Sequence, residues 1–281
     1  MRTLQAGAKL MLGDLELFGL SLSGIHTSLT LPQLGIAFDV AQGLPFSLKQ
    51  KKFFITHGHM DHAAGIPYVI SQKALLHEPP PIFYMPESLV LPMTEIMNQW
   101  EKIEKHDYQY EFISINEASE IDINPRYFIR PFSTVHRIES FGFTLFSRSK
   151  KLHPDFQGRS QSEIQNLSHQ GQDVSQTHIE PILSFTGDTQ IEFINKSRWA
   201  TEAKTLVMEC TYLDQRKDIA HAKTWGHTHL DELLLLLDEL KAKDILLIHL
   251  SSRYSIAEAE KILLERLPKK HQDRVRLFPG Q

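Results

Sequence analysis

Four residues of the types that bind metals lie between positions 57 and 62. The apolar segment Lys52–Thr56, which we predict to be a strand, leads directly to His57 and His59. In an extended chain these two histidines point the same way, because side chains alternate with a period of two. Asp61 and His62 follow where the chain should turn into a helix, so they can face a second metal beside the first. Solvated loop histidines are the alternative, and so dense a group of ligand types argues against it.

Three more residues of ligand type follow predicted strands, where the backbone fixes geometry better than a loop does. Singly, each could equally be a capping or core residue, but together they support one another. Two metals held close together would share a hydroxide at neutral pH, which could attack a phosphoryl or carbonyl group. No serine or cysteine nucleophile is then needed. The residues are His136, after Tyr127–Val135; Asp188, after Ile182–Phe185; and His249, after Asp244–Ile248.

The elements that must position these residues alternate between strand and helix. Apolar runs predict the further strands Leu15–Leu22, Gly35–Val40, Ile82–Met85, Phe141–Ser147, Thr205–Glu209 and Arg274–Phe278. Helical periodicity predicts Ala63–Leu76, Glu87–Lys105, Leu230–Leu240 and a last helix that Ser255 and Glu258 cap and Pro268 ends. We expect an α/β fold, with two sheets packed face to face under helices. Residues 1–281 should form one domain, with a polar excursion at about 148–180 and a short helix around Ser162–Leu167.

Composition points to a globular enzyme. The chain has 281 residues, of which 41% are hydrophobic and 23% charged, and 15 are histidines, well above ordinary usage. A formal charge of −4 provides no global field for polyanions, so such binding must use local basic clusters. The single cysteine, Cys210, excludes an internal disulfide framework and is expected to be buried. No apolar run could cross a bilayer or serve as a secretory signal, so we expect a cytoplasmic protein without membrane contact.

The ligand pattern resembles the metallo-β-lactamase superfamily, and finer motifs resemble ribonuclease Z, which trims the 3′ trailer of precursor transfer RNA. The likeness runs from about residue 24 to the end and is strongest to the short, plant-type form. It implies a four-layer αββα sandwich with two mixed sheets. The motifs are His57-x-His59-x-Asp61-His62, His136-Arg-Ile-Glu-Ser-Phe-Gly142, Ser184-Phe-Thr-Gly-Asp188-Thr, Met208-Glu-Cys-Thr-Tyr-Leu213, Gly226-His227-Thr and Leu247-Ile-His249-Leu-Ser-Ser-Arg253-Tyr254.

The resemblance also implies roles for individual residues. Two Zn²⁺ ions would be held, one by His57, His59 and His136, the other by Asp61, His62 and His249, with Asp188 bridging them; Mn²⁺ or Fe are alternatives. Asp61 would also serve as general base. Glu209 would orient His227 and raise its pKa, so that His227 can protonate the leaving 3′ oxygen. Arg253 would clamp a phosphate and, with Tyr254, bind substrate.

The expected activity is therefore metal-dependent endonucleolytic removal of the 3′ trailer by metal-hydroxide attack, which leaves a 3′ hydroxyl on the transfer RNA. A metal-dependent phosphodiesterase or esterase for a small substrate is the alternative, and a metal-free scaffold is a third interpretation. The resemblance also implies a homodimer. Bacterial members carry a Gly/Pro-rich arm that grips transfer RNA, whereas this chain has a polar excursion there, whose basic residues are Arg148, Lys150, Lys151 and Arg159.

Overall fold

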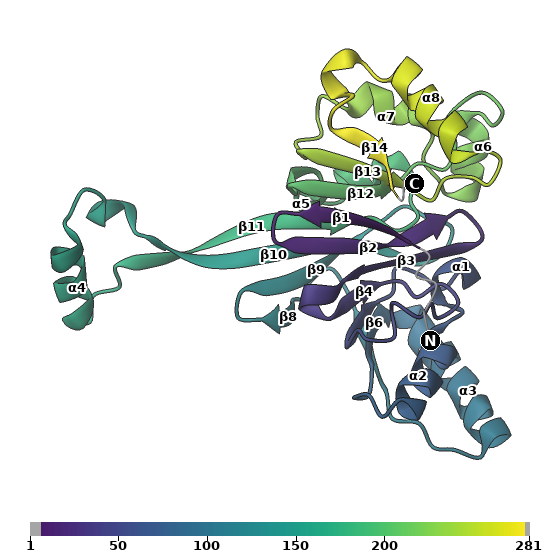
Figure 1. Ribbon diagram of the computed structural model, residues 1–281, viewed down its shortest axis with the longest axis horizontal. Coiled ribbons are helices and arrows are strands. Elements are labelled where there is room, and N and C mark those ends of the chain that lie inside the picture. Colours follow the sequence, from purple (N-terminus) through teal and green to yellow (C-terminus); the bar gives the residue numbers. More distant parts are fainter. Residues whose placement is uncertain (1–6, 279–281) are drawn as a thin grey trace.

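The computed structural model describes residues 7–278 and contains two β-sheets. The first sheet is built from the N-terminal part of the chain (Figure 1). Its seven strands follow one another in chain order; β1 to β4 pair antiparallel, and β4 to β7 pair in parallel. Buried and half-buried residues alternate along β2, as expected for a strand with one face on the core. The strands are β1 (Ala8–Leu12), β2 (Leu15–Leu22), β3 (His26–Leu31), β4 (Ile36–Phe38), β5 (Lys52–Phe54), β6 (Ile82–Pro86) and β7 (Glu111–Ile115).

The second sheet also has seven strands, in the order β14-β13-β12-β11-β10-β9-β8. Strands β11 to β14 pair in parallel, and β8 to β11 pair antiparallel. Every residue of the central strand β12 is buried, as is typical of a parallel strand covered on both faces. The strands are β8 (Ile121–Asn124), β9 (Tyr127–Ser133), β10 (Phe141–Leu152), β11 (Ser175–Phe185), β12 (Thr205–Glu209), β13 (Asp244–Ile248) and β14 (Val275–Leu277).

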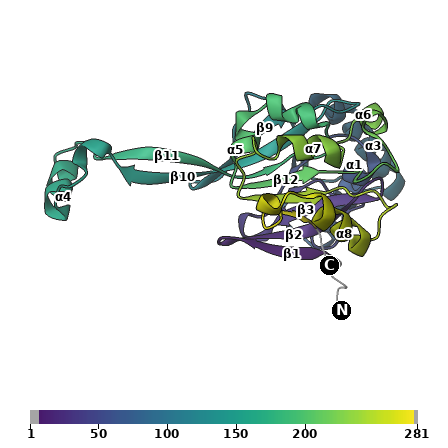
Figure 2. The ribbon, with the colours of Figure 1, turned by 90° about the horizontal axis from the view of Figure 1, so that it is seen from above.

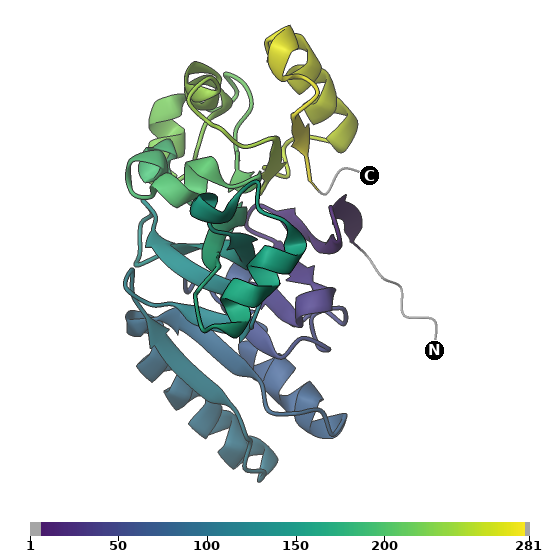
Figure 3. The same cartoon turned by 90° about the vertical axis from the view of Figure 1, so that its left-hand side faces the viewer.

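Helices cover the outer face of each sheet, and they lie at opposite ends of the molecule in Figure 3. The apolar core between the sheets takes residues from both, such as Phe38 and Phe54 from the first and Phe143 and Phe185 from the second. The predicted four-layer αββα sandwich is confirmed. On the first sheet lie α1 (Met60–Ala63), α2 (Ile66–Leu75) and α3 (Glu87–Glu104); α5 (Arg198–Glu202), α6 (Ile219–Trp225), α7 (Leu230–Leu236) and α8 (Ile256–Arg266) belong to the second half.

A long two-stranded arm projects from the body, and α4 (Gln161–His169) lies at its far end (Figures 1 and 2). Strands β10 and β11 pair from Phe143 with Phe185 as far as Leu152 with Ser175, well beyond the strands predicted for them. The polar excursion is thus largely regular structure. Its side chains face water on both sides, so no apolar alternation marks these strands in the sequence.

Most predicted elements occur close to their predicted positions. Strands β2, β12 and β13 have the predicted bounds, and α3 continues through Pro92. The predicted helix at 63–76 is α2, and the short helix α1, which was not predicted, precedes it. Ser255 caps α8 by accepting a hydrogen bond from the Glu258 N–H. Strands β1, β3, β7 and β8 and helices α5 and α6 were not predicted. Among residues 7–278, none of the helices combines the length and apolar character needed to cross a membrane.

Candidate active site

The predicted ligands converge at one edge of the sandwich, where strands of both sheets end. From the first sheet, β5 leads to His57. From the second, β11 leads to Asp188, β12 ends at Glu209 and β13 leads to His249. Ligands in open α/β sheets commonly lie beyond the carboxyl ends of the strands. Residues nearly 200 positions apart in the chain therefore meet here.

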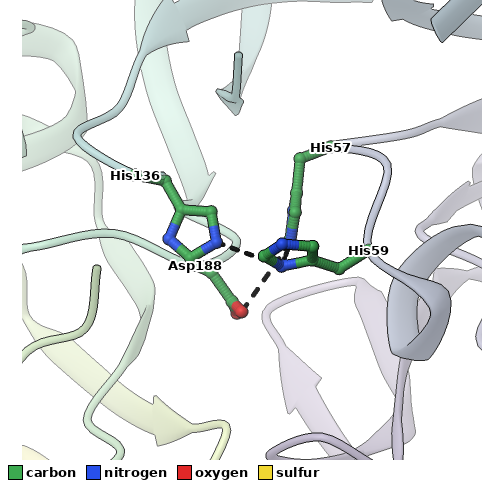
Figure 4. A group of neighbouring side chains, drawn as sticks. All are labelled: His57, His59, His136 and Asp188. Atoms are coloured by element: carbon green, nitrogen blue, oxygen red, sulfur yellow. Dashed lines mark hydrogen bonds and ion pairs between the residues drawn. The ribbon is translucent and has the colours of Figure 1, made fainter. Parts of the chain in front are cut away.

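Three histidines and one carboxylate form the first ligand group (Figure 4). His57 Nε2 lies 3.1 Å from His59 Nδ1, and His136 Nε2 lies 3.2 Å from the same His59 atom. Asp188 Oδ2 lies 3.8 Å from His57 Nε2. One atom from each residue lies within 4.8 Å of the others, so a single ion could be held by all four.

The second ligand group shares Asp188 with the first. Its other carboxylate oxygen, Oδ1, lies 3.3 Å from both His62 Nε2 and His249 Nε2. Asp61 Oδ2 lies 3.3 Å from His249 Nε2 and 3.6 Å from His62 Nε2. Asp188 thus presents one oxygen to each group, the arrangement that a bridging carboxylate requires. The structure brings together all seven predicted ligands, in the two sets expected from the sequence.

Hydrogen bonds on the outer side of four histidines fix which nitrogen faces the cluster. His136 Nδ1 donates to the Gly226 carbonyl at 2.8 Å, and His62 Nδ1 donates to Asp39 at 2.7 Å. The Nδ1 atoms of His57 and His249 face the hydroxyls of Thr56 and Thr211, which donate to carboxylates and so accept from the rings. In the neutral form, each ring therefore turns the lone pair of Nε2 inward, as a metal ligand does.

The buried atoms at the centre fit a divalent cation. His62 Nε2 and Asp188 Oδ1 are buried without a hydrogen-bond partner, although buried polar atoms are normally satisfied. Burial lowers the pKa of His57, His59 and His136, which favours the neutral imidazole that binds metals. Lone pairs and carboxylate oxygens that face one another repel unless positive charge lies between them. The donor set of histidine and aspartate suits zinc, manganese or iron.

Asp61 is ionised at this site. Burial opposes its ionisation, but the neighbouring imidazoles of His249 and His62, whose protonated forms donate to or attract the carboxylate, lower its pKa to about 2. Asp61 Oδ2 also accepts a hydrogen bond of 2.9 Å from the Gly24 N–H, which fixes the carboxylate against the β2–β3 turn. Asp61 is therefore held as an anion within the second ligand group.

Glu209 and His227 lie beside the second group. His227 Nδ1 is 2.9 Å from Glu209 Oε1, and both residues have an atom within 4.8 Å of His249. Burial alone would lower the pKa of His227, but the charge of Glu209 and the hydrogen bond to it raise that pKa to about 9. His227 keeps 13% of its side chain exposed, whereas Glu209 is fully buried. The imidazole is thus protonated at neutral pH and still accessible to a bound molecule.

Asp39 is a candidate functional residue that we did not predict. It is fully buried, and its carboxylate accepts hydrogen bonds from the Thr56 N–H, the Thr56 hydroxyl and His62 Nδ1. Its backbone has a φ of 53° and that of His249 a φ of 58°, left-handed conformations that are uncommon outside glycine and often mark functional sites. A short polar residue at the end of the apolar strand β4 was the available signal.

The structure places Arg253 and Tyr254 differently from each other. Arg253 is exposed and donates to Ser251 Oγ at 3.2 Å, which leaves most of its guanidinium available. Tyr254 is buried, and its hydroxyl accepts from the Leu213 N–H and donates to Asp214 Oδ1. Both hydrogen bonds of that hydroxyl are to residues of the chain itself, so these contacts do not support substrate binding by Tyr254.

Comparison with known proteins finds a matching family model and several similar proteins. A family model described as "Anti-Pycsar protein Apyc1" matches residues 40–272. The chain is 33% identical over 244 residues to tRNase Z TRZ1 of Arabidopsis thaliana, covering 86% of this chain and 87% of that protein. It is 29% identical to the chloroplastic tRNase Z TRZ2 of the same plant, covering 88% of this chain and 70% of that one. The short form of human tRNase Z has a similar fold, with a TM-score of 0.58 at 18% identity, over 83% of this chain and 91% of the human one.

The family model spans residues 40–272, which include every candidate metal ligand, and the relative at 33% identity covers 86% of the chain. The chain belongs to the metallo-β-lactamase superfamily of metal-dependent hydrolases, as a member both of the sequence family described as anti-Pycsar protein Apyc1 and of the ribonuclease Z (tRNase Z) family.

Proposed function

We propose that this protein is an endoribonuclease that removes the 3′ trailer of precursor transfer RNA and leaves a 3′ hydroxyl on the transfer RNA. The observation that carries the proposal is the contact between His227 and Glu209, beside the second ligand group. Hydrolysis of a phosphodiester with a poor leaving group benefits from an acid at the leaving oxygen, and a histidine with a raised pKa supplies one. The names of the plant relatives agree with this substrate.

The ligand groups support two divalent ions per chain, with zinc as the first candidate and manganese or iron as alternatives. One ion would be held by His57, His59 and His136 and the other by Asp61, His62 and His249, with Asp188 shared. Bound there, the ions would activate water and stabilise negative charge on the phosphoryl group. Zinc analysis of the purified protein, together with a His59→Ala variant that should lose metal and activity together, tests this assignment.

Residues of the chain would then move the protons and hold the substrate. Asp61, an anion within the second group, is suited to accept a proton from the attacking water. His227 would give its proton to the leaving 3′ oxygen, and Glu209 would keep the ring charged and oriented. The exposed guanidinium of Arg253 would hold a phosphate by paired hydrogen bonds.

The arm formed by β10, α4 and β11 is the proposed contact for the body of the transfer RNA. It extends away from the sandwich, as a contact with a distant part of a large substrate requires (Figure 2). Lys150 and Lys151 are exposed on it, whereas Arg148 is held at its root by Glu120 and Asp122. The arm thus offers fewer basic groups than its sequence indicates.

A homodimer is the proposed assembly, and apolar residues exposed on α2 and α3 support it. Ile96, Trp100 and Ile103 follow helical spacing along one side of α3, and Tyr68 lines the same hollow as Trp100. We call this surface, with Leu75, the α2–α3 face. Contiguous exposed apolar surface is typical of protein interfaces. The cytoplasm is the proposed compartment, which a free and buried Cys210 suits.

A second candidate is hydrolysis of a small phosphodiester. It is favoured by the net charge of −4 and by the match to an anti-Pycsar family model, whose name does not describe transfer RNA processing. Mapping the cleavage site on precursor transfer RNA, beside turnover of bis(p-nitrophenyl) phosphate, separates the two. A single cut at the trailer boundary supports the RNA activity, and turnover of the small ester alone would refute it.

A further inference from the structure

Arg137 and Trp225 face each other at the rim of the candidate active site. The guanidinium carbon of Arg137 lies 4.8 Å from the centre of the Trp225 ring. Arg137 is exposed, and Trp225 is 47% exposed although it is a large apolar residue. Arg137 directly follows His136, and Trp225 lies two positions before His227, so the pair stands beside both the first ligand group and the candidate acid.

Gly226 fixes this pair against the ligands. It ends α6 with a φ of 80°, and its carbonyl accepts the hydrogen bond from His136 Nδ1. A Cβ at Gly226 would lie 2.5 Å from His136 Nδ1 and 3.3 Å from Arg137 Cγ, so only glycine allows the two segments to approach so closely. The position of Trp225 relative to His136 is therefore set by backbone contact.

Arg137 is set apart by its place beside the ligand groups. Arg130, Arg148 and Arg216 also lie over aromatic rings, but each of them forms an ion pair with a carboxylate. Among the described residues, Arg126 and Arg159 lie over rings without an ion pair, but Arg126 lies between β8 and β9 and Arg159 lies in the arm. Within residues 7–278, Arg137 forms no ion pair. A half-exposed indole beside an unneutralised guanidinium suits a ligand that has both a flat ring and a negative charge, as a nucleotide has.

We propose that Trp225 and Arg137 form a clamp for the nucleotide on the 5′ side of the cleaved bond. This inference rests on the proposed function, in which His227 protonates the 3′ oxygen of that nucleotide. Trp225 lies on the same segment as His227, so a base attached to the leaving sugar can stack on the indole. Arg137 then binds the phosphate on the 5′ side of the same nucleotide. Stacking accepts any base, so the clamp positions the end of the RNA without reading its sequence.

The loss of activity from removing the base and the loss from removing the indole should not be additive, because each change removes the same stacking contact. With wild-type protein, a precursor transfer RNA that has an abasic nucleotide before the cut should show a kcat/KM lower by roughly 5- to 150-fold, the range for losing one stacked base. Trp225→Ala should show the same loss on the normal substrate and little further loss on the abasic one. Trp225→Phe, which keeps a ring, should retain most activity. Trp199→Ala, at a similarly exposed tryptophan on α5, is the matched control. If the fold-losses caused by Trp225→Ala and by the abasic substrate multiplied when the two were combined, the clamp would be overturned.

A binding measurement decides the inference even where no RNA is cut. In a Trp100→Phe/Trp199→Phe variant, Trp225 is the one tryptophan left of three. A short RNA with a 3′ hydroxyl should quench its fluorescence, and the same RNA with a terminal abasic nucleotide should not. Equal quenching by both, or by neither, would overturn the clamp. Failure of wild-type protein to cut precursor transfer RNA would instead refute the proposed function.

Arg137 has its own test within the same assay. Arg137→Ala should weaken RNA binding and reduce the dependence of log Kd on log salt by about one phosphate contact. Arg137→Lys should keep that salt dependence. An unchanged salt dependence in Arg137→Ala would assign the phosphate elsewhere and leave the guanidinium as a support for the indole alone.

Discussion

His227 Nδ1 lies 2.9 Å from Glu209 Oε1, and this contact joins the end of β12 to the segment after α6. Glu209 also accepts hydrogen bonds from the N–H groups of Thr189 and Thr211 and from the Thr211 hydroxyl. Because Thr211 Oγ1 contacts His249 Nδ1 at 3.1 Å, the same carboxylate indirectly orients a candidate metal ligand. One buried anion therefore links the candidate acid to the second ligand group.

His227→Ala should slow cleavage of precursor transfer RNA by about 10²–10⁴-fold, the usual effect of losing a general acid. The metal content should stay at the wild-type value, because His227 lies outside both proposed ligand sets. Single-turnover rates and elemental analysis of the same preparation check both points. His106→Ala, at an exposed histidine, is the control. Loss of metal together with activity would make His227 a ligand instead.

Glu209→Gln should move the alkaline limb of the pH–rate profile to lower pH. Burial lowers the pKa of His227, and the charge of Glu209 and its hydrogen bond raise it to about 9. Activity that requires the protonated ring falls as pH rises through that pKa. Without the carboxylate charge, burial dominates and the fall begins earlier. The profile of kcat/KM measures this shift, and a limb that stays in place would exclude His227 as the acid.

The sequence predicted where the candidate ligands come together because each of them follows a strand, and buried strands can be recognised from apolar runs alone. His57, Asp188 and His249 could be placed in this way. Asp39 also follows an apolar strand, but its role could not be predicted, because that role depends on Thr56 and His62, which come from later in the chain. Likewise, pairing in the arm depends on backbone contacts between two polar segments, which leave no local pattern. The role of Asp39 and the pairing in the arm could not be predicted because both depend only on contacts between distant parts of the chain.

Asp39→Asn should weaken divalent metal binding by about 10–100-fold, the usual effect of losing a partner that orients a metal-binding histidine. Three donors point at the Asp39 carboxylate, so an amide of the same shape would turn its NH₂ group toward one of them. Competition with a chelator of known affinity measures the loss. Asp273→Asn, at an exposed carboxylate, is the control. Unchanged affinity with a lower melting temperature would make Asp39 purely structural.

Ile103→Glu should convert a dimer into monomers. Ile103 is 66% exposed on the α2–α3 face, and a charge there would lie within the proposed interface. Light scattering after gel filtration should give about twice the 32.3 kDa chain mass for wild type and a single chain mass for the variant. Leu235→Glu, at a more exposed leucine on α7, should stay dimeric. A monomeric wild type would refute the homodimer.

Shortening the arm should raise KM for precursor transfer RNA, by about tenfold if the arm contributes about 1.4 kcal/mol of binding. Residues 153–174 lie between Leu152 and Ser175, which pair across the hairpin, so an Asn-Gly turn can close it without disturbing the register. The arm is far from the ligand groups, so kcat, metal content and turnover of bis(p-nitrophenyl) phosphate should not change.

Lys150→Ala/Lys151→Ala in the intact arm tests how much of the effect is electrostatic, because loss of a phosphate contact also reduces the salt dependence of binding. If the shortened protein kept the wild-type KM, the transfer RNA would be held by the body of the sandwich alone.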